Sequence, residues 1–116
     1  MNFFEEAEFG YRKAVEFGDH QLDTWLYWVD ILQFLGEFES AIQTLLQASE
    51  YFPEENEVEY RLAGLYFMIS DNIKAKFHLS NGLRLKPENY ILLEDLFPVV
   101  WAKKTVRNYI DKHNKQ

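Results

Sequence analysis

Histidines, serines and clustered carboxylates are the side chains in this sequence that could do chemistry, and each would need particular neighbours. A zinc site is normally built from closely spaced histidine and cysteine ligands. The chain has no cysteine, and its three histidines, His20, His78 and His113, lie far apart on different predicted elements. We therefore expect the histidines to occupy surface or groove positions, and we expect no metal site.

The remaining polar residues lack the patterns of catalytic or cofactor sites. No serine stands in a Gly-x-Ser-x-Gly turn, and no glycine-rich loop is present to hold phosphates. The glutamates at 5–6 and 54–59 could suggest paired acid–base groups, but both clusters fall at predicted helix starts, where the helix dipole favours negative charge. The sequence thus predicts no enzyme and no cofactor.

The composition is that of one folded domain. The chain has 116 residues, of which 47% are hydrophobic and 17% aromatic, so it can bury a core and is not predicted to be disordered. Nineteen acidic against twelve basic residues give a net charge of −7, which argues against nucleic-acid binding. Residues 1–98 carry −11 and residues 99–116 carry +4. The basic tail could contact an anionic surface, but the sequence favours a tail that complements the acidic body.

No segment has the length and apolar character of a membrane span. The most apolar stretch, residues 90–102, is interrupted by Glu94, Asp95 and Pro98. The N-terminus carries Glu5 and Glu6 where a signal peptide would be basic and then apolar. We therefore expect no membrane contact and a cytoplasmic location.

Apolar residues recur every three or four positions almost throughout, which predicts an all-α fold. Glycines 18 and 36 and prolines 53 and 87 mark helix ends. Asn2 with Glu5, and Asn56 with Glu59, have the spacing of a helix-capping pair. The predicted helices span residues 3–17, 23–35, 38–52, 57–69, 72–85, 88–97 and 103–113.

The helical pattern also repeats every 34 residues. Ala41 recurs as Ala75, and Pro53 recurs as Pro87. Over residues 3–97 this period, with two helices in each unit, resembles the tetratricopeptide repeat family. The resemblance implies antiparallel helical hairpins stacked as a right-handed solenoid. It divides a single domain, residues 1–116, into a half repeat (3–17), two repeats (22–55 and 56–89) and a divergent repeat with a capping helix (90–116).

Two parts of the chain depart from the family pattern. In the second repeat Glu59 stands where a large apolar residue is usual, Ser70 replaces a turn glycine and Gly82 replaces an alanine, so we expect looser packing there. Residues 3–17 match only the second helix of a unit, which suggests a fragment of a longer array. The run Leu96-Phe97-Pro98 looks like the closing segment of bacterial members of the family.

The resemblance implies a protein-binding groove lined by the first helix of each repeat. We therefore expect a non-catalytic interaction scaffold that binds a peptide or partner helix. Because acids and aromatics share this groove, the partner should be basic and partly apolar. The predicted lining residues are Asp23, Leu26, Tyr27, Asp30, Gln33, Phe34, Glu57, Tyr60, Arg61, Gly64, Phe67 and Met68. Some family members clamp the C-terminal carboxylate of chaperones with basic residues, but Asp30 and Asp95 would oppose that here.

Two alternatives stay open at this point. The first predicted helix could mediate weak self-association through Phe3, Phe4 and Tyr11. The chain could also be an accessory segment of a larger multidomain protein or enzyme.

Overall fold

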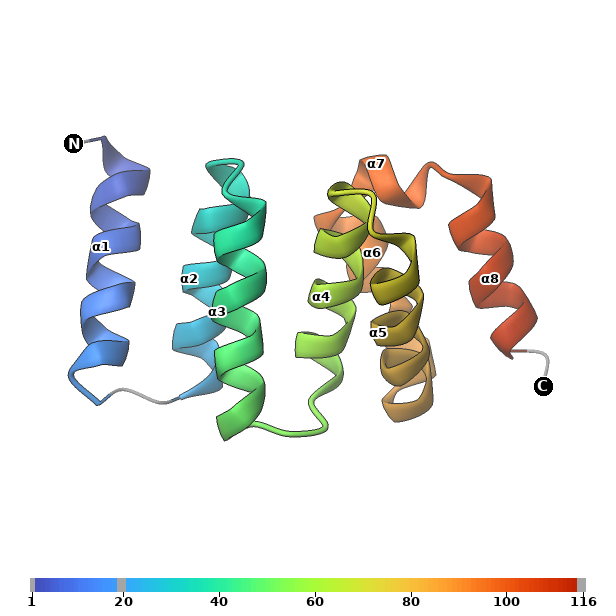
Figure 1. Ribbon diagram of the computed structural model, residues 1–116, viewed down its shortest axis with the longest axis horizontal. Coiled ribbons are helices and arrows are strands. Elements are labelled where there is room, and N and C mark those ends of the chain that lie inside the picture. Colours follow the sequence, from blue (N-terminus) through green and yellow to red (C-terminus); the bar gives the residue numbers. More distant parts are fainter. Residues whose placement is uncertain (1, 19–20, 115–116) are drawn as a thin grey trace. The chain divides into compact units, whose positions relative to one another are not determined.

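The computed structural model describes residues 2–18 and 21–114, which form helices joined by short connections (Figure 1). These residues contain no β-strand, so the predicted all-α class is confirmed. The chain divides into two compact units, residues 1–53 and residues 54–116, which we call unit 1 and unit 2 and describe separately. None of the described helices combines the length and apolar character needed to cross a bilayer.

Unit 1 contains three helices, α1 (Phe3–Glu16), α2 (Leu22–Phe34) and α3 (Phe38–Tyr51), and α2 packs against both of the others. The predicted cap at Asn2 is confirmed, because its side chain accepts a hydrogen bond of 2.9 Å from the backbone N–H of Glu5. Gly36 ends α2 with a φ of +79°, in the left-handed region that glycine adopts without strain. Each of these three helices begins and ends within one residue of its predicted bounds.

Unit 2 begins with the hairpin of α4 (Asn56–Met68) and α5 (Asn72–Leu85). A 3₁₀ turn, η1 (Pro87–Tyr90), and three further helices follow: α6 (Ile91–Leu96), α7 (Pro98–Trp101) and α8 (Lys104–Asn114). The single predicted helix at 88–97 is therefore η1 followed by α6. Helix α7 was not predicted. Pro98 opens it, because the first position of a helix needs no N–H donor.

The predicted cap at Asn56 is wrong. Asn56 is the first residue of α4, and its side-chain oxygen accepts a hydrogen bond of 2.6 Å from the Asn89 amide in η1. Glu59 is likewise turned away from the helix start, toward α5. Both side chains are therefore used in packing the elements of unit 2 together.

The 34-residue period is present in the backbone. Helices α4 and α5 begin and end 34 residues after α2 and α3. In α2 the Gly36 N–H bonds the Gln33 carbonyl at 3.0 Å, and in α4 the Ser70 N–H bonds the Phe67 carbonyl at 3.1 Å. Ser70 adopts the left-handed turn without glycine, at a φ of +65°. The two hairpins share one local design, while their stacking into a solenoid stays a prediction.

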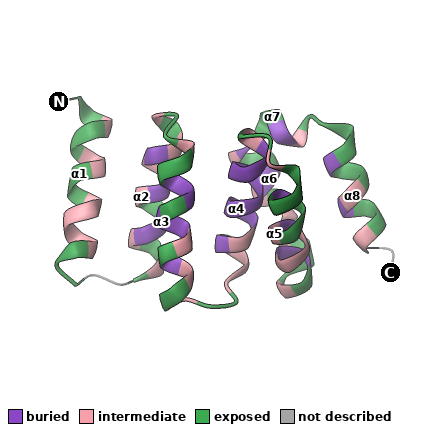
Figure 2. Ribbon diagram, in the orientation of Figure 1, coloured by how far each residue is buried: buried purple, intermediate pink, exposed green. Residues whose placement is uncertain are grey.

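The core is densest in α4, where residues 60–67 are all buried, whereas α1 has no buried residue (Figure 2). The expected loose packing of the second repeat is therefore wrong at α4. Gly82 leaves room for the Tyr60 ring, whose atoms would lie 3.0 Å from a Cβ at that position. Glu59 accepts hydrogen bonds from His78 Nδ1 at 2.7 Å and from the Asn81 amide at 3.3 Å. Gly82 and Glu59 are thus both accommodated within the packing of this hairpin.

Candidate binding surfaces

The predicted groove residues differ sharply between the two units. In unit 1, Asp23, Tyr27 and Phe34 are exposed, Asp30 and Gln33 are half-buried, and only Leu26 is buried. In unit 2, four of the six are buried, and Glu57 and Met68 are half-buried. The four buried residues are Tyr60, Arg61, Gly64 and Phe67. These four and Leu26 were expected to face a partner, and their burial corrects that expectation.

Unit 2 covers this face of α4 with its own chain. The Phe97 ring, at the end of α6, lies so close to Gly64 that a Cβ there would overlap it. The Tyr60 hydroxyl donates a hydrogen bond of 2.8 Å to the Lys86 carbonyl. Burial, and secondarily the negative charge of Glu88, raises the pKa of the Tyr60 phenol well above its usual range. Tyr60 is a neutral core residue and not a docking residue.

Unit 1 instead presents five aromatic side chains on α1 and α2, which we call the aromatic strip. Phe34 stacks on Phe4 with ring centroids 4.1 Å apart, and Tyr27 lies 6.0 Å from Tyr11. Phe3 packs edge-on against Phe4 at 5.4 Å and completes the strip. Tyr27 remains 54% exposed and Phe34 69% exposed. The aromatic contacts between α1 and α2 therefore leave much ring surface open to solvent.

The net charge also differs between the two units. Unit 1 contains two basic and ten acidic residues, a net charge of −8, whereas unit 2 contains ten basic and nine acidic residues, a net charge of +1. The basic residues of the C-terminal tail thus belong to a nearly neutral unit. The acidity that the whole-chain charge suggested is concentrated in unit 1.

A pocket of about 420 Å³ in unit 1 has an acidic lining that the sequence argument missed. Glu5, Glu8 and Glu37 contribute carboxylates, with Arg12 as the one basic group among its lining residues. The Trp28 indole N–H in this lining donates a hydrogen bond of 3.0 Å to Glu8. Glu5, Glu8 and Arg12 follow helical spacing in the sequence, which is the signal that could have placed them on one face.

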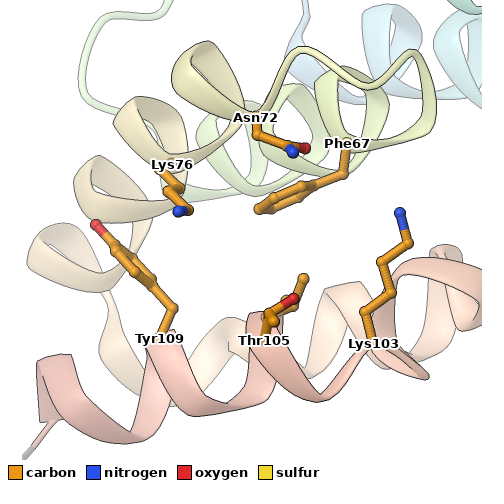
Figure 3. Close-up of a pocket in the computed structure, with 7 residues that line it drawn as sticks. Phe67, Asn72, Lys76, Lys103, Thr105 and Tyr109 are labelled. Carbon is orange, nitrogen blue, oxygen red and sulfur yellow. The ribbon is translucent and has the colours of Figure 1, made fainter.

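Unit 2 has a pocket of the opposite character, which we call the lysine pocket (Figure 3). It measures about 310 Å³ and lies between the start of α5 and the first turns of α8, with Lys76 and Lys103 in its lining. In the sequence, Lys103 is one of the basic residues of the C-terminal tail. The pocket joins Lys103 and three residues of α8 to three residues from positions 67–76, so only the tertiary structure brings the set together.

The histidines do not form a site. His78 bonds Glu59 and stacks on the Tyr66 ring at 5.5 Å, and His113 lies 6.4 Å from the Tyr109 ring. His20 lies outside the described residues. Within the described ranges, no three His, Cys, Asp or Glu side chains gather in a group that could hold a metal ion.

No protein-family model, curated protein or solved structure gives a significant match to this chain. The resemblance to tetratricopeptide repeats therefore rests on the chain's own residues and on its 34-residue period.

Proposed function

We propose that this chain is a non-catalytic protein-binding domain, of tetratricopeptide type, whose unit 1 holds a basic, partly apolar segment of a partner protein on the aromatic strip. The observation that carries the proposal is the exposure of Tyr27 and Phe34 on one helix of a strongly acidic unit. In the proposed solenoid, the unit 1 part of the groove binds the partner, and the face of α4 does not.

Aromatic side chains suit a docking role because they offer a large apolar area and lose little rotamer freedom on binding. Soluble proteins rarely leave large apolar groups clustered in water without a use for them. The rings of the strip are already held by each other, since Phe4 supports Phe34 and Tyr11 supports Tyr27. A partner would therefore meet a surface that is partly ordered before binding.

The charge of unit 1 adds selectivity for basic partners. A net charge of −8 attracts cationic segments and repels acidic ones at a distance. At contact, a lysine or arginine can also lie over an aromatic face. Helix α1 shows this geometry within the chain, where Arg12 and Lys13 lie 5.5 and 5.4 Å from the centre of the Phe9 ring. The missing cysteines agree with action in a reducing cytoplasm.

The test is a binding titration with a defined probe, a fluorescent amphipathic peptide of leucine and lysine. The doubly substituted chain Tyr27→Ala/Phe34→Ala should bind it at least about tenfold more weakly than the natural chain, because two anchor rings are lost. Tyr51→Ala is the matched control, since Tyr51 is 55% exposed on α3 and lies outside the strip. A second peptide with glutamate in place of lysine should bind weakly to every variant.

Circular dichroism would first confirm that all the variants are folded. Equal affinity of the natural chain and the double variant for the lysine peptide would refute the aromatic strip as the binding surface. Equal affinity of the lysine and glutamate peptides would refute the proposed preference for basic partners.

Self-association is a second candidate, favoured by three exposed phenylalanines of the N-terminal region. Phe3 is 72%, Phe9 44% and Phe17 83% exposed. Phe4 and Tyr11, by contrast, pack against α2 within the same unit. Light scattering decides this candidate, because a mass equal to one chain at every concentration excludes it.

A further inference from the structure

The lysine pocket of unit 2 combines hydrogen-bond donors at its rim with an apolar floor. The floor consists of Phe67 and Val106, which are 5% and 3% exposed. The rim consists of lysine, amide and hydroxyl groups, and no carboxylate belongs to the lining. At about 310 Å³ the pocket has the size of a small ligand site (~300–1,000 Å³).

The two lysines give the pocket a positive charge that nothing in its lining neutralises. In Figure 3 the Lys76 and Lys103 side chains reach in from opposite sides of the Phe67 ring. Across the described ranges, neither ammonium group has an ion-pair partner, whereas nearby Lys74 lies 4.0 Å from the Asp71 carboxylate. An anion in the pocket would be attracted by both ammonium groups.

Neutral donors surround the same space. Asn72, Thr105 and Tyr109 add an amide and two hydroxyl groups to the lining. Thr105 lies in the first turn of α8, an 11-residue helix whose N-terminal end carries a partial positive charge. The groups around the rim therefore favour a negatively charged oxygen group over a cation.

The apolar residues of the pocket restrict the class of ligand further. A small inorganic anion would use the lysines but would not contact the apolar part of the lining, to which Phe67, Val106 and the half-buried Tyr109 ring contribute. A flat apolar group on this floor would remove apolar surface from water and so add to the binding free energy. We propose that the lysine pocket binds a small organic acid, in which a carboxylate attracted by the charges of Lys76 and Lys103 is attached to an aromatic ring that contacts the apolar part of the lining.

This site is independent of the proposed partner-binding function, because it lies in the other unit and selects the opposite charge. The probe is 3-phenylpropionate, titrated into the full chain and followed by NMR at the amides of residues 67–76 and 103–109. Two matched compounds separate the contributions: 3-phenylpropionamide lacks the charge, and acetate lacks the ring. We expect the amide and acetate to bind at least about tenfold more weakly than 3-phenylpropionate.

Lys76→Gln/Lys103→Gln should weaken 3-phenylpropionate binding by about tenfold or more. The matched control, Lys86→Gln/Lys112→Gln, removes the same charge from exposed positions of unit 2 that do not line the pocket, and it should leave the affinity unchanged. The proposal is overturned if the two double variants lose affinity equally, or if acetate or the amide binds as tightly as the acid. Shifts confined to residues outside the pocket would also overturn it.

Discussion

Units 1 and 2 contain hairpins with the same helix lengths and the same turn geometry. The first helix of the unit 1 hairpin is partly exposed, whereas the first helix of the unit 2 hairpin is covered by other parts of its unit. Helix α2 keeps Tyr27 and Phe34 exposed, whereas every residue from 60 to 67 of α4 is buried. The cause is the chain that follows α5, since the Phe97 ring lies on Gly64 and α6 and α7 pack against α4. The segment that follows a hairpin, and not its helix pattern alone, thus decides whether the face of its first helix stays exposed.

The two hairpins also show how a core tolerates exchanged residues. Positions 34 residues apart hold Leu26 and Tyr60 on the first helix, and Ala48 and Gly82 on the second. The larger ring in unit 2 is matched by the smaller residue that faces it. Trp25 is replaced at the same offset by Glu59, whose carboxylate is hydrogen-bonded to α5. Each change is compensated within its own hairpin.

The largest expected difference in stability is between substitutions of Tyr60 in unit 2 and Tyr27 in unit 1. Tyr60→Ala should lower the free energy of unfolding by about 3–5 kcal/mol, because it leaves a cavity in the core. Tyr27→Ala should change it by less than about 1 kcal/mol, because the ring is 54% exposed. Chemical denaturation measures both. Similar losses from the two substitutions would contradict the contrast between an open and a closed helix.

A pair of glycines gives the next comparison. Gly64→Ala should destabilise the chain by about 1–3 kcal/mol, since the new methyl group overlaps the Phe97 ring. Gly10→Ala is the matched control on α1, where a Cβ meets nothing within 4 Å, and it should stabilise the chain by about 0.5–1 kcal/mol. Thermal unfolding of the two variants should therefore shift in opposite directions. A shift of the same sign in both would show that Phe97 does not close the α4 face.

Leu26 and Ala48 of unit 1 correspond to Tyr60 and Gly82 of unit 2. This exchange predicts that substitutions at residues 60 and 82 have coupled effects on stability. Gly82→Ala alone should cost about 1 kcal/mol or more, because the Cβ would lie 3.0 Å from the Tyr60 ring. Adding Tyr60→Leu gives unit 2 the residues of unit 1, so the double variant should be more stable than the sum of the single effects predicts. A double-mutant cycle measures this term, expected at about 1 kcal/mol. Strict additivity would mean that the two positions do not compensate one another.

The smallest expected effect is a loss of folding stability at alkaline pH. Because burial raises the pKa of the Tyr60 phenol in the folded chain, the unfolded chain loses this proton first as the pH rises above about 10. The stability contributed by Tyr60 is therefore complete below that pH and falls above it. Tyr60→Phe should show a shallower alkaline loss of stability than the natural chain in unfolding experiments between neutral pH and pH 11. Parallel profiles would indicate that Tyr60 is not buried as described.

The sequence predicted the helices well because apolar spacing, glycines and prolines are local signals. It placed α5 at residues 72–85 without error. It could not predict that Phe97 would lie on Gly64, because that contact joins residues 33 positions apart through the bend between α6 and α7. For the same reason it missed the lysine pocket, where residues near 72 meet residues near 105. The 34-residue period places the first helices of the two hairpins at equivalent positions. It gives no information on which of these helices is covered by the chain that follows.

Residue-level mapping of the leucine–lysine peptide on the intact chain tests the central claim most directly. NMR spectra of the natural chain with and without the peptide report on α2 and α4 in the same sample. We predict chemical-shift changes centred on Tyr27 and Phe34 and on the facing residues of α1, with residues 60–67 unchanged. Changes centred on residues 60–67, with α2 unaffected, would contradict the assignment of the binding surface to unit 1.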